Sequence, residues 1–163
     1  MKRTLLIVSA LAVILIAGCN GNGSDSGTAA TILDNISTET IAQEIFTEIE
    51  IPSSVQKGAE DLEFFFSGLT LEGIRELSYY ICASGAFPDE LLIIKFDTAR
   101  QAADAKPAVQ SRLESRRDDF RDYAPDEMYK LDSAEVRTNS NWLFFFVTEN
   151  NARVSGIINS YVG

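Results

Sequence analysis

The spacing of apolar residues along the chain predicts helices at both ends of its folded part and one long helix between them. Residues 38–50, 98–123 and 154–161 each place apolar side chains on one face at helical spacing. Pro107 lies inside the long helix and is expected to kink it or to delay its start, and a short helix is expected to begin near Pro125. The first apolar face consists of Ala42, Ile45, Phe46 and Ile49, and the last of Val154, Ile157, Ile158 and Tyr161.

Other segments have the shorter period of β-strands. Two apolar runs within residues 77–97, separated by a glycine and a proline, predict a hairpin with a long loop. Residues 134–138 and 141–149 predict a second hairpin. Residues 59–69 and 71–77 are interpreted as short helical turns, although the three phenylalanines of the first segment would also fit a short strand.

This order of elements predicts an α+β fold. We expect a four-stranded, mostly antiparallel sheet in ββα-ββα order, with the two main helices on one face and N-terminal helices before it. The last strand is apolar at every position from 142 to 147, so both of its sides are apolar. It is therefore either covered on both faces, which we favour, or presents one face to a partner, with Trp142 and Phe145 as the candidate contact residues.

The first residues have the three zones of a bacterial export signal. Lys2 and Arg3 precede an apolar stretch that is short for a membrane span, and Leu15-Ile-Ala-Gly18-Cys19 closes it with small residues before a cysteine. This ending resembles the lipobox of bacterial lipoproteins. The resemblance implies cleavage between Gly18 and Cys19 and a diacylglyceryl group on the Cys19 thiol. The alternative is an uncleaved anchor with an incidental cysteine.

These features divide the chain into three parts. Residues 1–18 are expected to be a lipoprotein signal peptide, and residues 19–30 a flexible linker rich in Gly, Ser and Asn. Residues 31–163 are expected to form one α+β domain. A calcium loop in the linker is rejected because Thr31 stands where the bidentate glutamate would be needed.

Several motifs in the second half of the chain, "ASGAFPDELLIIKF", "FRDYAPDEMYKLDSAEV" and "NWLFFFV", resemble a family of bacterial lipoproteins catalogued as a domain of unknown function. The resemblance covers residues 77–162 and the layout of lipobox and linker. The spacing that supports it is that of Phe120, Tyr123, Pro125, Glu127 and Leu131. The resemblance implies that the protein lies at the surface of a Gram-positive cell. It assigns no catalytic or binding residue, because the family has no assigned activity. Pro107 departs from the family pattern.

Charge and composition exclude several functions. The net charge is -10. Two of the basic residues, Lys2 and Arg3, precede Cys19, so the part of the chain from Cys19 onward is more acidic still. Nucleic-acid binding is excluded because such a surface repels phosphates. The chain has no histidine, which removes the usual imidazole base and histidine-containing zinc sites. No cofactor or metal is expected.

The remaining candidate chemistry is sparse. Cys82 lies in a strand-like segment and is interpreted as a structural cysteine. Asp89 and Glu90, beside Phe87, are the nearest approach to a carboxylate pair, but an ordinary turn is favoured. Ser84 lacks the glycines of a nucleophile elbow. An acidic cluster near the end of the long helix is expected to form local ion pairs with interleaved arginines and not a metal site; its members are Asp118, Asp119, Asp122, Asp126 and Glu127.

We therefore expect a lipid-anchored, extracytoplasmic protein with a non-catalytic domain that binds another envelope protein. Its contact with the membrane would be through the lipid on Cys19. A small-ligand or cation-binding lipoprotein is the alternative, and an enzyme that modifies the cell envelope is the third. A pocket lined by Tyr79, Tyr80 and acidic residues would favour the ligand, and an exposed patch at Trp142 or Phe145 would favour the partner.

Overall fold

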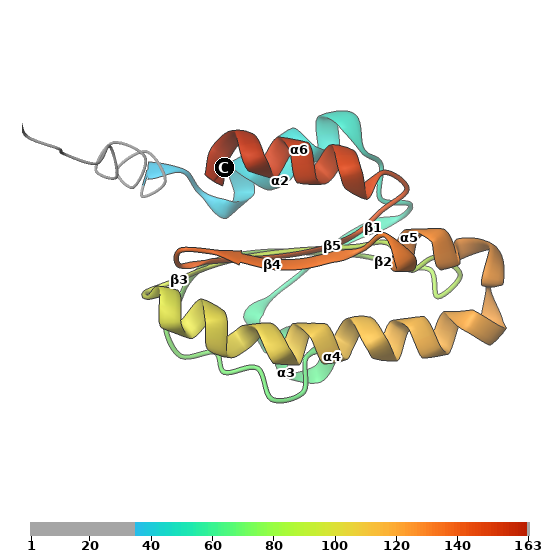
Figure 1. Ribbon diagram of the computed structural model, residues 1–163, viewed down its shortest axis with the longest axis horizontal. Coiled ribbons are helices and arrows are strands. Elements are labelled where there is room, and N and C mark those ends of the chain that lie inside the picture. Colours follow the sequence, from blue (N-terminus) through green and yellow to red (C-terminus); the bar gives the residue numbers. More distant parts are fainter. Residues whose placement is uncertain (1–34, 163) are drawn as a thin grey trace, which may run out of the picture.

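Two layers of helices enclose an antiparallel sheet in the computed structural model, which describes residues 35–162 (Figure 1). The sheet has five strands in the order β1-β2-β3-β5-β4. The elements follow along the chain as α2 (Thr38–Glu48), β1 (Ser54–Lys57), α3 (Ala59–Phe65), β2 (Ile74–Cys82), β3 (Glu90–Phe96), α4 (Ala99–Tyr123), the 3₁₀ turn η1 (Pro125–Glu127), α5 (Met128–Asp132), β4 (Glu135–Asn139), β5 (Trp142–Val147) and α6 (Asn151–Val162).

The sheet confirms the α+β class and both predicted hairpins, but not the number of strands. β2 pairs with β3, and β4 with β5, both antiparallel. β1 is a fifth strand that the sequence pattern did not indicate, and it pairs with β2. The segment 71–77 is also corrected: from Ile74 onward it is part of β2 and not a helical turn. The alternative strand at the three phenylalanines is wrong, because α3 extends to Phe65.

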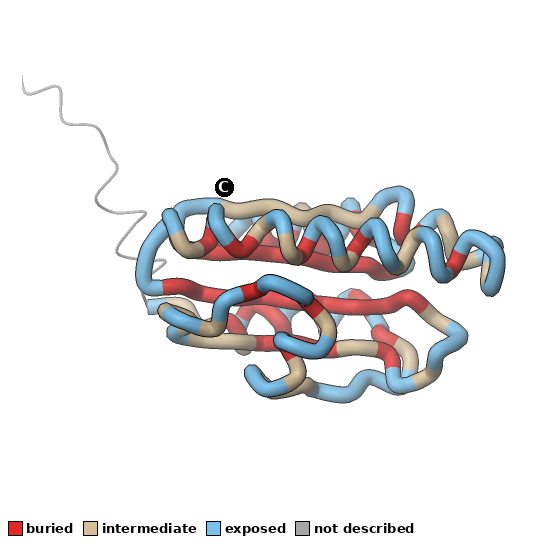
Figure 2. The backbone as a smooth tube through the Cα atoms, turned by 90° about the horizontal axis from the view of Figure 1, so that it is seen from below, coloured by how far each residue is buried: buried red, intermediate tan, exposed pale blue. Residues whose placement is uncertain are grey.

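The helices cover both faces of the sheet, which corrects the expectation that the two main helices share one face. α2 and α6 lie on one side, and α3 and α4 on the other (Figure 1). β3 and β5 occupy the middle of the sheet, and every residue of both strands is buried (Figure 2). A strand covered on both faces requires apolar side chains at consecutive positions, which explains the uninterrupted apolar runs in these two segments.

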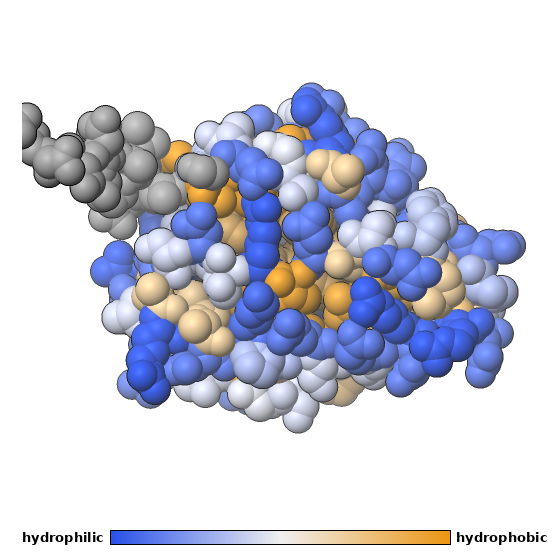
Figure 3. Space-filling model, in the orientation of Figure 1, coloured by the Kyte–Doolittle hydropathy of each residue, from blue (hydrophilic) through white to orange (hydrophobic). Residues whose placement is uncertain are grey.

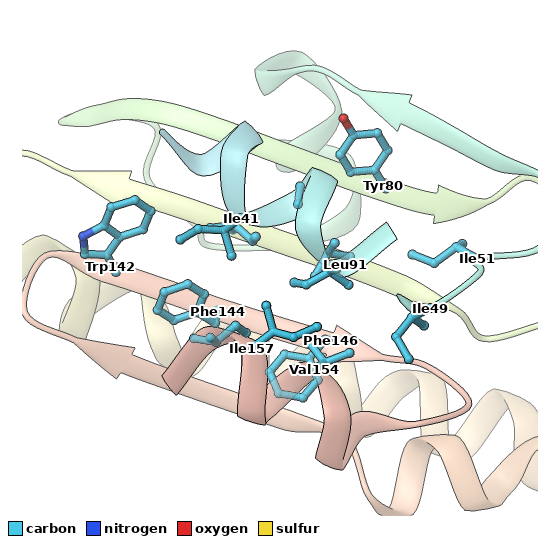
Figure 4. Packing of buried hydrophobic residues seen from close by; sticks show 14 of the residues in the cluster. Ile41, Ile49, Ile51, Tyr80, Leu91, Trp142, Phe144, Phe146, Val154 and Ile157 are labelled. Carbon is cyan, nitrogen blue, oxygen red and sulfur yellow. The ribbon is translucent and has the colours of Figure 1, made fainter. Parts of the chain in front are cut away.

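The hydrophobic core is therefore divided by the sheet into two parts. On the α2 and α6 side, Phe144 and Phe146 of β5 face Val154 and Ile157 of α6, with Ile41 of α2 beside them (Figure 4). On the other side, α3 and α4 pack against the opposite side chains of the same strands. The residues of β3 and β5 that face that side are Leu92, Ile94, Leu143, Phe145 and Val147.

Helix α4 is continuous from Ala99 through Pro107, so the predicted late start is wrong. Its N-terminus is capped by Thr98 and Gln101, each of which hydrogen-bonds the backbone N–H of the other. Proline removes the N–H that would donate to the carbonyl of Ala103, four residues earlier. Pro107 and Ala103 are both exposed, so water can hydrate that carbonyl and the helix tolerates the proline.

Candidate functional site

The candidate partner face is not accessible in the folded domain. Trp142 and Phe145 are both fully buried, and they lie on opposite sides of the sheet. Trp142 stacks on Phe144, with ring centroids 5.9 Å apart, and Lys95 lies over its ring. Of the two alternatives for β5, the structure shows the covered one, and any partner must contact other residues.

The carboxylates of the β2–β3 loop form the most elaborate polar site in the described part of the chain. Glu90 begins β3 with only 1% of its surface exposed. It accepts a hydrogen bond of 2.7 Å from the Tyr79 hydroxyl, and Arg112 of α4 lies 3.2 Å from its other oxygen. Arg116, one turn further along α4, is 4.0 Å away. The negative charge of Glu90 is thus balanced by two arginines of α4, while the neighbouring strand supplies a hydrogen bond.

Asp89 is held separately, by α5. Its side chain is fully buried, and the ammonium of Lys130 donates to Oδ2 over 2.8 Å. Lys130 also lies 2.8 Å from Glu127 and covers the ring of Phe87. Burial raises the pKa of the Asp89 carboxyl, and Lys130 opposes this shift without cancelling it. The second oxygen, Oδ1, has no hydrogen-bond partner among the described residues.

This arrangement fixes the loop between β2 and β3, and side chains of the same domain occupy both of its carboxylates. A general acid and base must face a substrate, whereas Asp89 is tied to Lys130 and Glu90 to Arg112. Burial also raises the pKa of the Tyr79 phenol, and Glu90 adds to the shift, so this hydroxyl stays a hydrogen-bond donor. Cys82 is buried, and the Ser84 hydroxyl accepts a hydrogen bond from the backbone of the same loop.

Asp89 and Glu90 are recognisable in the sequence as a candidate pair, but the cations that hold them are not. Arg112, Arg116 and Lys130 come from α4 and α5, far from the loop in sequence. A signal was nevertheless present, because a carboxylate that begins an otherwise apolar strand needs a buried partner. The sequence does not show which of the nearby basic residues supplies it.

Tyr79 and Tyr80 do not line a common pocket, because they project to opposite sides of the sheet. Tyr80 instead donates to Glu39 of α2, over 2.8 Å to Oε1. Ser78 and Gln43 donate to the same carboxylate over 3.0 and 2.6 Å. Burial raises the pKa of Tyr80 to about 12, and the bond to Glu39 contributes. This network attaches the first helix to β2.

The network predicts a loss of stability in acid that depends on Glu39. Burial raises the pKa of Glu39, but its three hydrogen bonds outweigh that effect and the pKa is lowered from 4.5. The unfolded chain therefore binds more protons, so the free energy of unfolding falls as the pH drops below about 4.5 toward the lowered value. In urea unfolding between about pH 3 and 7, where carboxyls titrate, the stability of Glu39→Gln should depend less steeply on pH than that of the wild type.

The matched control for this titration is Glu63→Gln, at an exposed glutamate of α3. It should leave the slope of stability against pH as it is in the wild type. Equal slopes for Glu39→Gln and the wild type would contradict the assignment of the acid transition to this network.

A hollow of about 150 Å³ lies elsewhere, between the loop before β2 and the first turns of α4. None of the candidate residues from the sequence lines it. Two of its lining residues are buried and apolar, and two are exposed carboxylates; the full lining is Thr70, Glu72, Phe96, Gln101, Asp104 and Ala105.

The expected ion pairs with interleaved arginines form at part of the acidic cluster near the end of α4, whereas Glu127 pairs with Lys130. Arg121 lies 3.1 Å from Asp118, and Arg117 lies 2.7 Å from Glu114. Within residues 35–162, no group of three or more acidic or cysteine side chains could hold a metal ion. In the same range, no helix combines the length and apolar character that a membrane crossing needs. Gly18, Cys19 and the predicted linker lie outside the described residues.

The comparisons with known proteins agree with one part of the sequence analysis. A family model described as a domain of unknown function, DUF4358, matches residues 48–148. The match starts earlier than the segment that carried the resemblance, and includes β1, α3 and the whole of β2. No curated protein and no solved structure matches the chain.

Proposed function

The chain belongs to the DUF4358 family of domains of unknown function, and from this premise we propose that it is a lipid-anchored extracytoplasmic protein whose domain binds a partner without catalysis. The observation that carries the anchor is the sequence from Leu15 to Cys19, which has small residues before a cysteine at the end of an apolar stretch. The first helix, α2, begins at Thr38, and residues 19–30, between the cysteine and this helix, are rich in Gly, Ser and Asn. A diacylglyceryl group on Cys19 would tether it to the outer face of a Gram-positive membrane.

The non-catalytic part of the proposal is supported by the internal pairing of the buried charges. The carboxylates most suited to acid–base chemistry, Asp89 and Glu90, are neutralised by Lys130 and Arg112. Their positions serve to hold the β2–β3 loop against α4 and α5. An acidic surface supported on a rigid three-layer domain suits recognition of a basic or neutral envelope protein.

The aromatic side chains that remain outside the core are the better candidates for partner contact. Phe64 at the end of α3 is 83% exposed, and Tyr123 and Tyr129 near the end of α4 are 69% and 53% exposed. Exposed aromatic residues are frequent anchors of interfaces. They replace Trp142 and Phe145 in this role, since those two residues belong to the core.

The anchor is tested by Cys19→Ala in cells supplied with a fatty-acid analogue. We expect this substitution to abolish labelling and to leave the signal peptide uncut, because the thiol is the acceptor of the lipid. Cys82→Ala is the matched control, since Cys82 is buried in β2 and should not affect labelling. Labelling of Cys19→Ala at the wild-type level would refute the proposed anchor.

A second candidate function is binding of a small cationic ligand. It is favoured by the hollow beside α4, which is lined by the apolar Phe96 and Ala105 and by the acidic Glu72 and Asp104; Asp104 also lies 3.4 Å from Arg100. A hollow of this size holds a molecule of only a few heavy atoms. If crosslinking through Phe64 and Tyr129 in intact cells yields no envelope protein, this function gains weight over the first.

A further inference from the structure

Strand β4 forms one edge of the sheet, and no described residue pairs with its outer side. It is the strand nearest the viewer in Figure 1. Four of its five residues, from Glu135 to Thr138, are partly exposed. Figure 3, in the same orientation, shows apolar surface between the two helical layers, where Figure 1 draws the edge of the sheet. In an antiparallel pair, every second residue of an edge strand turns its N–H and C=O away from its neighbour, so β4 can accept a further strand.

Arg137, in the middle of this edge, has hydrogen-bonding capacity that the described residues do not use. Its Nη1 donates to Ser155 and Asn159 of α6, over 3.2 and 2.9 Å, and its guanidinium lies over the Phe144 ring. The other two nitrogens, Nε and Nη2, are shielded from water and have no partner among the described residues. These two nitrogens form the side of a guanidinium that binds a carboxylate through two parallel hydrogen bonds.

Glu135 supplies a carboxylate on the same side of the same strand. Residues two apart in a strand project to one face, and both side chains contact Ser155 of α6. Within one chain, the shortest approach of Glu135 to Arg137 is 3.9 Å, at Nη1, which is too long for a hydrogen bond. Its side chain is 39% exposed, so it has capacity for a second cation.

From these contacts we infer that β4 pairs with β4 of a second copy of this chain, antiparallel and with the two-fold axis at Val136. This register places Glu135 of each copy opposite Arg137 of the other, twice in one interface. Each carboxylate then lies beside the facing guanidinium, whose Nε and Nη2, shielded in a single copy, reach it when the Arg137 side chain changes rotamer. The two sheets join into one continuous sheet, and the two Val136 side chains lie opposite each other on the α4 side.

The occupant is a second copy because the charge pattern of the edge is complementary to itself. A Glu and an Arg placed symmetrically about one residue match the same pattern running in the opposite direction, which is the requirement for an isologous interface. The opposite edge, β1, lacks this pattern: its sequence is Ser54-Val-Gln-Lys57. Pairing of β4 with β1 would also leave a free edge on each copy and produce open chains in place of a dimer.

The register is tested by a single cysteine at the axis. In the full chain purified in detergent, Val136→Cys should form an intermolecular disulfide on mild oxidation with copper phenanthroline. Facing Cα atoms of an antiparallel pair are about 4.5 to 5.5 Å apart, within the range of disulfides. We expect about tenfold more covalent dimer than in the wild type, where Cys82 and any Cys19 left without lipid set the background, because the geometry is favourable.

Two matched variants show whether another arrangement forms instead. In the proposed register the two Thr138 Cα atoms are displaced by about 13 Å along the strands, so Thr138→Cys should stay at background. Val55→Cys reports pairing through β1 and should also stay at background. A Val136→Cys variant that folds but forms no disulfide overturns the inference, and so does a larger yield from Thr138→Cys or Val55→Cys.

Charge exchange tests the paired side chains directly in the Val136→Cys background. Glu135→Arg and Arg137→Glu should each return the disulfide to background, because like charges then face each other. The two changes together restore opposite charges, and the disulfide should recover. Thermal melts identify variants that have lost their fold, and Arg137→Gln gives a milder loss of the same pair. A double variant that folds without recovering the disulfide overturns the proposed pairing.

Discussion

Replacing Lys130 by methionine is expected to destabilise the domain by about 3–5 kcal/mol. The substitution keeps the length and apolar stem of the side chain but leaves the carboxylate of Asp89 without its 2.8 Å partner. Asp89 is fully buried, and Oδ1 already lacks a hydrogen bond among the described residues, so no second group compensates for the loss. The measurement is the free energy of unfolding in urea at neutral pH.

The pH dependence of this variant identifies Asp89 as the cause. Burial already raises the pKa of Asp89, and removal of Lys130 should raise it further. A carboxyl with a raised folded-state pKa stabilises the protein when protonated, and this contribution is lost as the pH rises through that value. The destabilisation by Lys130→Met should therefore shrink as the pH falls.

Two further variants complete the experiment. Lys106→Met makes the same change at a partly exposed lysine of α4 that forms no ion pair with a described residue, and should alter stability by less than about 0.5 kcal/mol. Asp89→Asn combined with Lys130→Met removes the charge that was left unpaired, and should be more stable than Lys130→Met alone. If Lys130→Met lowers the free energy of unfolding by no more than Lys106→Met does, the buried pair of Asp89 and Lys130 does not hold the loop.

The sequence predicted the parts of this fold that have a long, regular period. The two hairpins and the helices 38–50, 98–123 and 154–161 are all present, because each depends on many residues that agree. β1 was missed because its four residues are mostly exposed and show no alternation. The start of β2 was missed because a shift of register between Ile74 and Glu76 interrupts its alternation.

The candidate site was predictable only in part, for a related reason. Asp89 and Glu90 could be identified because they stand out beside an apolar strand. Their partners Lys130 and Arg112 could not, since the tertiary fold and not a local pattern brings α4 and α5 to the loop. The hollow beside α4 has no sequence signal, because ordinary residues from two segments line it.

The sequence was compatible with helices on one face of the sheet or on both. Both sides of β5 are apolar, which is expected when helices cover both faces of a sheet. The ββα-ββα order suggested instead that the two main helices share one face. The structure places α6 against Phe144 and Phe146, and α4 on the side of Phe145, so the composition of the strand was the better guide.

Phe144→Ala and Phe145→Ala are each expected to destabilise the domain by about 3–5 kcal/mol, as measured by urea unfolding. The two residues are neighbours in β5 and both fully buried, but each belongs to a different half of the core. Phe64→Ala is the matched control, because its ring is 83% exposed, and it should cost less than about 0.5 kcal/mol. A small loss at Phe145 but not at Phe144 would mean that the α4 side of β5 is open, and would restore Phe145 as a partner contact. Large losses at both positions require two covering layers, and leave exposed side chains such as Phe64 as the ones through which a partner can bind.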